Sequence, residues 1–121
     1  MLPGAHRLTK RGDYARVRQQ GRSRAHPLLI LVAAPNSGEM TRVGIIAGKK
    51  IGTAVVRNRV KRLLREAARA RLSCLPPGYD IVLIARQEAA GARLDDITVA
   101  LDVLLQRERL LAPGQNRSAG R

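Results

Sequence analysis

Short apolar runs alternate with longer amphipathic stretches along this chain. The run at 27–35, PLLILVAAP, is closed by proline at both ends, and its length is typical of a strand. The turn-like stretch NSGEMT separates it from a second apolar run at 42–48, RVGIIAG. We therefore predict that these two runs form a β-hairpin. A third run at 79–86, YDIVLIAR, is rich in β-branched residues and predicts another strand.

Two other stretches show the apolar spacing of helices. A helix is predicted from about 9 to 20, and Gly21 can end it. Near the C-terminal end, Asp95 or Asp96 can cap a last helix. The apolar face of that last helix consists of Ile97, Leu101, Leu104 and Leu105.

The longest amphipathic stretch precedes the third apolar run. Thr53 is a good N-cap for a helix from Ala54 to about Leu72, which ends before Pro76 and Pro77. The predicted order of elements is helix, strand, strand, helix, strand, helix, or αββαβα. This order favours an α+β fold, a two-layer sandwich in which a small sheet packs against helices.

The length of 121 residues suits one domain. We assign 1–112 to a single domain and 113–121, PGQNRSAGR, to a flexible tail, because the tail has hardly any apolar residues. The apolar run LLILVAA is far shorter than the roughly 18 residues of a membrane-spanning helix, so we expect no membrane partner. No secretion signal is visible, and the single cysteine, Cys74, fits a reducing, cytoplasmic location.

The charge of the chain changes this picture most. It has 23 Lys and Arg residues against 9 Asp and Glu, a net charge of +14, which favours a polyanionic partner. The densest run is RNRVKRLLR at 57–65. On a helical wheel Arg57, Lys61, Arg62 and Arg65 share one face and the apolar residues take the opposite face. A single-sign face of this kind favours a phosphate-binding ridge over an ordinary solvated face.

The predicted ridge includes cations outside the densest run, because Lys49 and Lys50 precede the helix and extend the same surface. Within the helix, the ridge consists of Arg57, Asn58, Lys61, Arg62, Arg65 and Arg69. The role of Asn58 stays open at this point. It can separate two arginines on the surface, or its amide can present both a donor and an acceptor to a nucleotide.

Motifs for protein-based catalysis are not evident. The stretch GIIAGKK lacks the glycine spacing of a P-loop and has Lys50 where the motif requires Ser or Thr. His6 and His26 have no Cys or acidic cluster at metal-ligand spacing. Asp95 and Asp96 are adjacent on a helix and point apart, which is poor geometry for a general acid and base. We therefore expect no catalytic residue and no metal site in the protein.

Three stretches resemble the bacterial ribonuclease P protein subunit family. RVGIIAGKKIGTAVVRNRVKRLLREAAR at 42–69 is similar to the family's core signature, including its RNR motif. RLTKRGDYARVRQQGRS at 7–23 resembles the N-terminal helix, and YDIVLIARQEAA at 79–90 resembles the third strand and the following loop. The resemblance covers about 7–110 and implies a fold like that of ribosomal protein S5 domain 2.

The resemblance implies a small protein that binds ribonuclease P RNA and helps it remove the 5′ leader of precursor tRNA. Hydrolysis in that family is carried out by Mg²⁺ ions held by the RNA, and there is no small-molecule substrate. By position, Arg59 joins the RNA-binding residues predicted above. The family also has a cleft for the single-stranded leader between the sheet and the N-terminal helix. The matching positions are Tyr14, Arg18, Ile30 and Val32.

The leader cleft departs from the family pattern at two of these positions. Arg18 and Val32 stand where other members commonly have aromatic residues, which implies weaker base stacking and more reliance on charge. The Tyr14 ring can contact the leader in the cleft, pack inward against the small core, or do both.

Two other classes of protein could show similar features. A basic ribosomal or other structural RNA-binding protein would have the same charge and fold class, and only the extended signature separates it. A DNA-binding protein could place 54–72 in the major groove as a recognition helix. That helix has few short polar side chains besides Asn58, and its basic face suits phosphates better than base edges.

Overall fold

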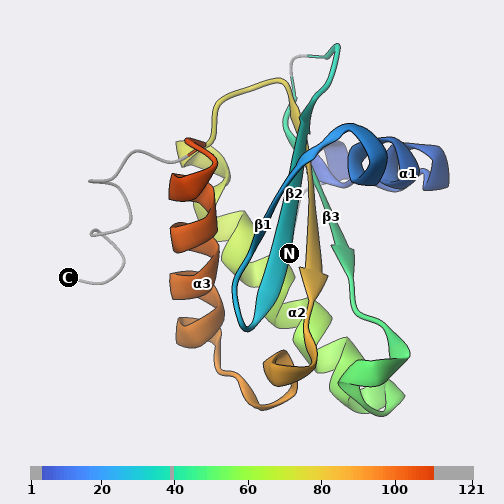
Figure 1. The fold of residues 1–121 in the computed structure, drawn as a ribbon, viewed down its shortest axis with the longest axis vertical. Coiled ribbons are helices and arrows are strands. Elements are labelled where there is room, and N and C mark those ends of the chain that lie inside the picture. Colours follow the sequence, from blue (N-terminus) through green and yellow to red (C-terminus); the bar gives the residue numbers. More distant parts are fainter. Residues whose placement is uncertain (1–3, 39, 111–121) are drawn as a thin grey trace.

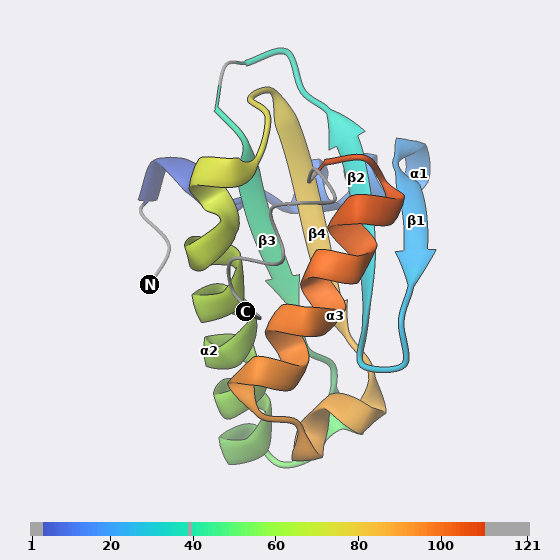
Figure 2. The same ribbon diagram turned by 90° about the vertical axis from the view of Figure 1, so that its left-hand side faces the viewer.

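The computed structural model describes residues 4–38 and 40–110. Its four strands form one sheet in the order β1-β2-β4-β3 (Figure 1). The strands are β1 (Arg22–Ala25), β2 (Leu29–Pro35), β3 (Arg42–Ile46) and β4 (Tyr79–Ala85). The α-helices are α1 (Arg11–Gln20), α2 (Ala54–Arg71) and α3 (Leu94–Arg107). Helices α2 and α3 lie side by side on one face of the sheet (Figure 2), and α1 packs on the other.

The predicted α+β sandwich is confirmed, with one strand more than expected. Strand β1 pairs antiparallel with β2, so the observed order of helices and strands is αβββαβα. Its sequence, RSRA, has three polar residues and no alternation, which explains why the apolar pattern did not reveal it. The tail predicted at 113–121 lies outside the described residues.

The predicted hairpin between the runs at 27–35 and 42–48 is wrong. Strand β4 lies between β2 and β3, antiparallel to β2 and parallel to β3. The physical reason is burial, because five of the seven residues of β4 are buried and such a strand is most stable in the centre of a sheet. Strand β3, with three partly buried residues, takes the edge.

The sheet separates two apolar clusters. The larger lies under α2 and α3 and includes Leu29, Leu31 and Leu83, all nearly inaccessible to solvent. The smaller lies under α1 and includes Val17 and Val82. Alternate residues of each central strand thus contribute to opposite faces, as the period of two requires.

Helix ends agree with the sequence at α2 and differ at α3. The Thr53 hydroxyl caps α2 by accepting a hydrogen bond from the Val56 N–H at 3.3 Å. Helix α3 begins at Leu94 with Arg93 as its N-cap, two residues before Asp95 and three before Asp96. The Asp96 carboxylate still satisfies a backbone donor there, because it accepts from the Arg93 N–H at 3.0 Å.

A buried ion pair joins the two helices that cover the larger cluster. The Arg71 guanidinium on α2 donates to both oxygens of Asp102 on α3, at 2.6 and 2.9 Å. This hydrogen bonding raises the pKa of Arg71 above its ordinary value. The pair fixes α2 relative to α3, and therefore fixes which face of α2 points outward.

Candidate nucleic-acid interface

Helix α2 has two chemically distinct faces. Val60, Leu64 and Ala67 are buried against the sheet and α3. The opposite face carries the predicted ridge, in which Asn58, Arg62 and Arg69 are exposed and Arg57, Lys61 and Arg65 are half-buried. The amphipathic pattern of the sequence therefore has the orientation that was predicted from it.

Most of the ridge has no partner within residues 4–38 and 40–110. Among the residues that the structure describes, seven ridge side chains make no hydrogen bond or ion pair with any other residue. They are Lys49, Lys50, Arg57, Asn58, Lys61, Arg62 and Arg65. The six cations among them lie on α2 or just before it and repel one another, so a bound polyanion would stabilise this surface.

Arg57 shows the lack of partners at the level of one atom. Its Nε is buried from solvent and has no hydrogen-bond partner in the described part of the chain. Buried donors are almost always satisfied in folded proteins, because an unsatisfied one costs about 1–3 kcal/mol.

The other two predicted RNA-binding residues, Arg59 and Arg69, form hydrogen bonds within the protein. Arg59 donates to the carbonyl oxygens of Ala90 and Ala92, at 3.0 and 2.6 Å, and so fastens α2 to the segment around η4 (Gln87–Gly91). Arg69 donates to Glu66, and this hydrogen bond lowers the pKa of the Glu66 carboxyl. Arg59 therefore has an evident structural role, whereas the seven partnerless side chains do not.

Lys49 and Lys50 lie just before α2, in the short helix η2 (Lys49–Ile51), and both are exposed. Gly52 then adopts a φ of 148°, a conformation that side chains disfavour. Glycine at this position lets the chain turn from η2 directly into α2. The two lysines are thereby placed at the N-terminal end of the ridge, as predicted.

The four predicted cleft residues lie on α1 and the sheet face beneath it, but they are not equally open. Tyr14 is half-buried, Arg18 is exposed and Ile30 is half-buried. Val32 is 5% exposed, and the end of α1 at Gly21 covers it. The structure therefore places Val32 inside the apolar cluster under α1.

Two isoleucines that the sequence analysis missed lie beside Ile30. Ile84 on β4 pairs with Ile30 on β2 and with Ile46 on β3, so the three form one row across the sheet. All three are half-buried. They could not be identified from the sequence because the strand order that aligns them was predicted incorrectly.

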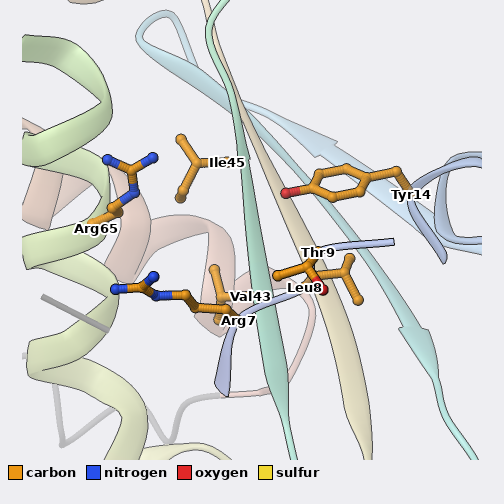
Figure 3. A pocket seen from close by; sticks show the side chains of 7 residues that line it. All are labelled: Arg7, Leu8, Thr9, Tyr14, Val43, Ile45 and Arg65. Carbon is orange, nitrogen blue, oxygen red and sulfur yellow. The ribbon is translucent and has the colours of Figure 1, made fainter. Parts of the chain in front are cut away.

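A pocket of about 370 Å³ opens at the outer edge of β3, between α1 and α2 (Figure 3). Tyr14 reaches this edge because its ring lies directly over Gly44, where a Cβ atom would come within 2.5 Å of the ring. The lining residues are Arg7, Leu8, Thr9, Tyr14, Val43, Ile45 and Arg65. Arg65 and Tyr14 were predicted as site residues of different surfaces, and the structure brings them to one pocket.

A buried carboxylate attaches α1 to the sheet. Asp80 is fully buried and accepts hydrogen bonds from Arg42 at 2.8 and 2.9 Å, from Asn36 at 2.8 Å, and from Arg16 on α1. Burial alone would raise the pKa of Asp80, but hydrogen bonds from Arg42 and Asn36 and the charges of Arg42 and Arg16 outweigh it and lower the pKa. This network positions α1, and with it Tyr14.

Comparison with known proteins shows which family has this arrangement. The family model for ribonuclease P matches residues 2–109. The chain belongs to the ribonuclease P protein family. It is 40% identical to the ribonuclease P protein component of Dehalococcoides mccartyi strain CBDB1, over 95% of this chain and 94% of that protein. With the corresponding protein of Herpetosiphon aurantiacus it shares 42% identity, over 88% of this chain and 86% of that protein.

Solved structures of ribonuclease P proteins have the same fold. The Staphylococcus aureus protein superposes with a TM-score of 0.81 at 30% identity, over 88% of this chain and 98% of that chain. As a ribonuclease P protein component, the chain works with an RNA subunit in a tRNA-processing ribonuclease. In its described residues, no helix is long and apolar enough to cross a bilayer.

Proposed function

We propose that the ridge on α2 binds the phosphate backbone of ribonuclease P RNA. The observation that carries this proposal is the set of seven ridge side chains without a partner in the described protein. A surface rich in unpaired Arg and Lys suits phosphates, because each contact releases counterions and arginine can bind phosphate through two donors. Arg59 fixes the position of α2. The side-chain amide of Asn58 provides a hydrogen-bond donor and acceptor for the RNA, next to the cations of the ridge.

The second part of the proposal concerns the 5′ leader of precursor tRNA. The leader lies in the cleft between α1 and the sheet, against Tyr14 and the row of Ile30, Ile84 and Ile46. Arg18, exposed at the end of α1, contacts a leader phosphate or stacks on a base. Because aliphatic side chains replace most aromatic surface, binding depends less on stacking and more on charge.

The chemistry of cleavage belongs to the RNA subunit in this proposal. Mg²⁺ ions held by that RNA supply the activated water and stabilise the developing charge during leader removal. The side chains of this protein bind and orient the RNA components, and none of them transfers a proton to the reacting atoms. The complex acts in the cytoplasm.

Reconstitution tests the proposed function. The purified protein is added to a bacterial ribonuclease P RNA and a 5′-labelled precursor tRNA at low Mg²⁺ concentration, where the RNA alone is slow. We expect the protein to accelerate release of the leader. No acceleration over the RNA alone, with a folded protein, would exclude the proposed function.

A substitution in the cleft tests the leader contact separately. Tyr14→Ala removes the ring from the cleft and should weaken binding of precursor tRNA to the reconstituted enzyme by roughly 1–3 kcal/mol if the ring stacks on a base. Binding of mature tRNA, which lacks the leader, should be nearly unchanged. Equal losses for both tRNAs would remove Tyr14 from the leader site.

A further inference from the structure

The pocket at the edge of β3 lies between the two surfaces proposed to bind RNA. Arg65 enters it from the ridge on α2, and Tyr14 enters it from α1 (Figure 3). Arg7 and Thr9 complete its polar lining from the segment before α1. The pocket therefore lies between the ridge on α2 and Tyr14 of the predicted leader cleft.

Local structure holds the lining residues in place. The Leu8 N–H donates to the Val43 carbonyl at 3.0 Å, and Arg7 pairs with Val43 in a parallel β-bridge. The N-terminal segment is thus fixed along the edge of β3, which positions Arg7 and Thr9. Tyr14 is fixed by the contact of its ring with Gly44.

The polar groups of the pocket suit an anion. Two guanidinium groups and two hydroxyl groups line it, and none of its lining residues is acidic. Arg65 and the Tyr14 hydroxyl make no hydrogen bond with other residues of the described chain, so their donors are available to a ligand. The volume of about 370 Å³ lies within the range of roughly 300–1,000 Å³ that is usual for ligand pockets.

The apolar lining adds a second requirement. Ile45 is half-buried and, with Val43 and Leu8, forms the wall next to the polar groups. A free inorganic anion would leave this wall unused. A nucleotide unit matches both parts, because its phosphate is anionic and its ribose and base have apolar surface.

We propose that this pocket binds one phosphodiester group of an RNA strand, with the phosphate between Arg7 and Arg65 and the adjoining ribose against Ile45. The pocket is then the point at which RNA contacts continue from the ridge to the leader cleft. This inference rests on the proposed function and names a subsite for it. The ribonuclease P RNA and the precursor tRNA leader share the phosphodiester chemistry, and the experiment distinguishes them.

The test compares two arginines of the N-terminal segment. Arg7→Gln removes a cation that lines the pocket, whereas Arg11→Gln removes an exposed cation from the first residue of α1 that does not line it. Both variants lower the net charge by one, so long-range attraction to RNA changes equally. Tyr14→Phe is the third variant, because it removes only the hydroxyl and keeps the ring over Gly44. Circular dichroism and thermal unfolding verify that each variant is folded.

Two affinities are measured for each variant, one for ribonuclease P RNA alone and one of the reconstituted enzyme for precursor tRNA relative to mature tRNA. We expect Arg7→Gln to lose roughly tenfold in one of them, as for a lost charged hydrogen bond, with a smaller loss for Tyr14→Phe and little loss for Arg11→Gln. A loss in the first affinity assigns the phosphate to the catalytic RNA, and a loss in the second assigns it to the leader.

Equal affinities of Arg7→Gln and Arg11→Gln in both measurements, with Tyr14→Phe like the wild type, would overturn the pocket proposal. If the wild-type protein stimulates cleavage in the same preparation, the proposed function survives that result. If the wild-type protein does not stimulate cleavage, the result excludes the proposed function. The pocket proposal is then excluded too, because it rests on that function.

Discussion

Arg59 and Arg62 lie three residues apart on α2 and carry the same charge, but the protein uses them differently. Arg59 is half-buried and donates two hydrogen bonds to backbone carbonyls, whereas Arg62 is exposed and has no partner among the described residues. The same residue type is thus part of the scaffold in one position and available to a ligand in the other. A sequence pattern cannot separate these roles, because the partners of Arg59 are 31 and 33 residues away.

The difference predicts that two alanine substitutions have unequal effects on stability. Arg59→Ala should lower the free energy of unfolding by about 1–3 kcal/mol, because two carbonyls lose charged donors. Arg62→Ala should change it by less than about 0.5 kcal/mol, as is usual for exposed positions. Urea denaturation followed by circular dichroism measures both. Similar stabilities of the two variants would contradict the structural role of Arg59.

The lowered pKa of Asp80 predicts how the free energy of unfolding depends on pH. Its pKa is lowered in the folded protein from an ordinary value of 3.8, so the folded state favours the ionised carboxylate. The stabilisation is therefore fully present above about pH 4–5 and is lost as the pH falls through the lowered folded pKa. Asp80→Asn removes this contribution.

Urea denaturation at several pH values tests this expectation. At pH 7 the wild type should be more stable than Asp80→Asn, and the difference should shrink as the pH falls below about 4. If the variant does not fold, Arg16→Met serves instead, since it removes one of the charges that lower this pKa. A difference that stays constant between pH 7 and pH 3 would contradict the assignment to Asp80.

At the scale of elements, the position of α1 depends on how closely it approaches β3. The Tyr14 ring occupies the space that any Cβ at Gly44 would require. Contacts of this kind depend on strand order, which the apolar pattern did not determine. The helices and the central strands were predictable because their apolar residues recur with a regular period, and Thr53 marked the start of α2 correctly.

The strand order and the edge strand β1 were not predictable for the same physical reason. Pairing of β3 with β4 joins residues that are 38 positions apart, and β1 carries no apolar signal. The shared face of the ridge residues in α2 was predictable because these residues lie on one helix. The pocket was not, since Arg7, Tyr14 and Arg65 come from three separate segments.

The contact between Tyr14 and Gly44 predicts a non-additive pair of substitutions. Gly44→Ala should destabilise the protein by about 1–3 kcal/mol, because the new methyl group overlaps the ring. In a Tyr14→Ala background the same change should cost much less. Denaturation of the four proteins gives the coupling energy directly. Additive effects would show that the ring does not occupy this space.

At the scale of the whole molecule, the basic residues that give the net charge of +14 fall into two groups with different roles. Several basic residues form ion pairs that hold elements together, as Arg42 does with Asp80 and Arg71 with Asp102. Six basic residues of the ridge, Lys49, Lys50, Arg57, Lys61, Arg62 and Arg65, instead make no hydrogen bond or ion pair with any other residue that the structure describes. This division between structural and unpaired cations explains how a small domain can fold and still present a surface for a polyanion.

The central claim is that the ridge binds RNA phosphates, and the salt dependence of RNA affinity tests it most directly. The affinity for ribonuclease P RNA is measured between low and moderate salt for the wild type, Arg62→Ala and Arg107→Ala, an equal charge change on α3. The claim predicts that Arg62→Ala lowers the slope of log affinity against log salt by about one unit, whereas Arg107→Ala leaves it nearly unchanged. An unchanged slope for Arg62→Ala, or equal decreases for both variants, would contradict the claim.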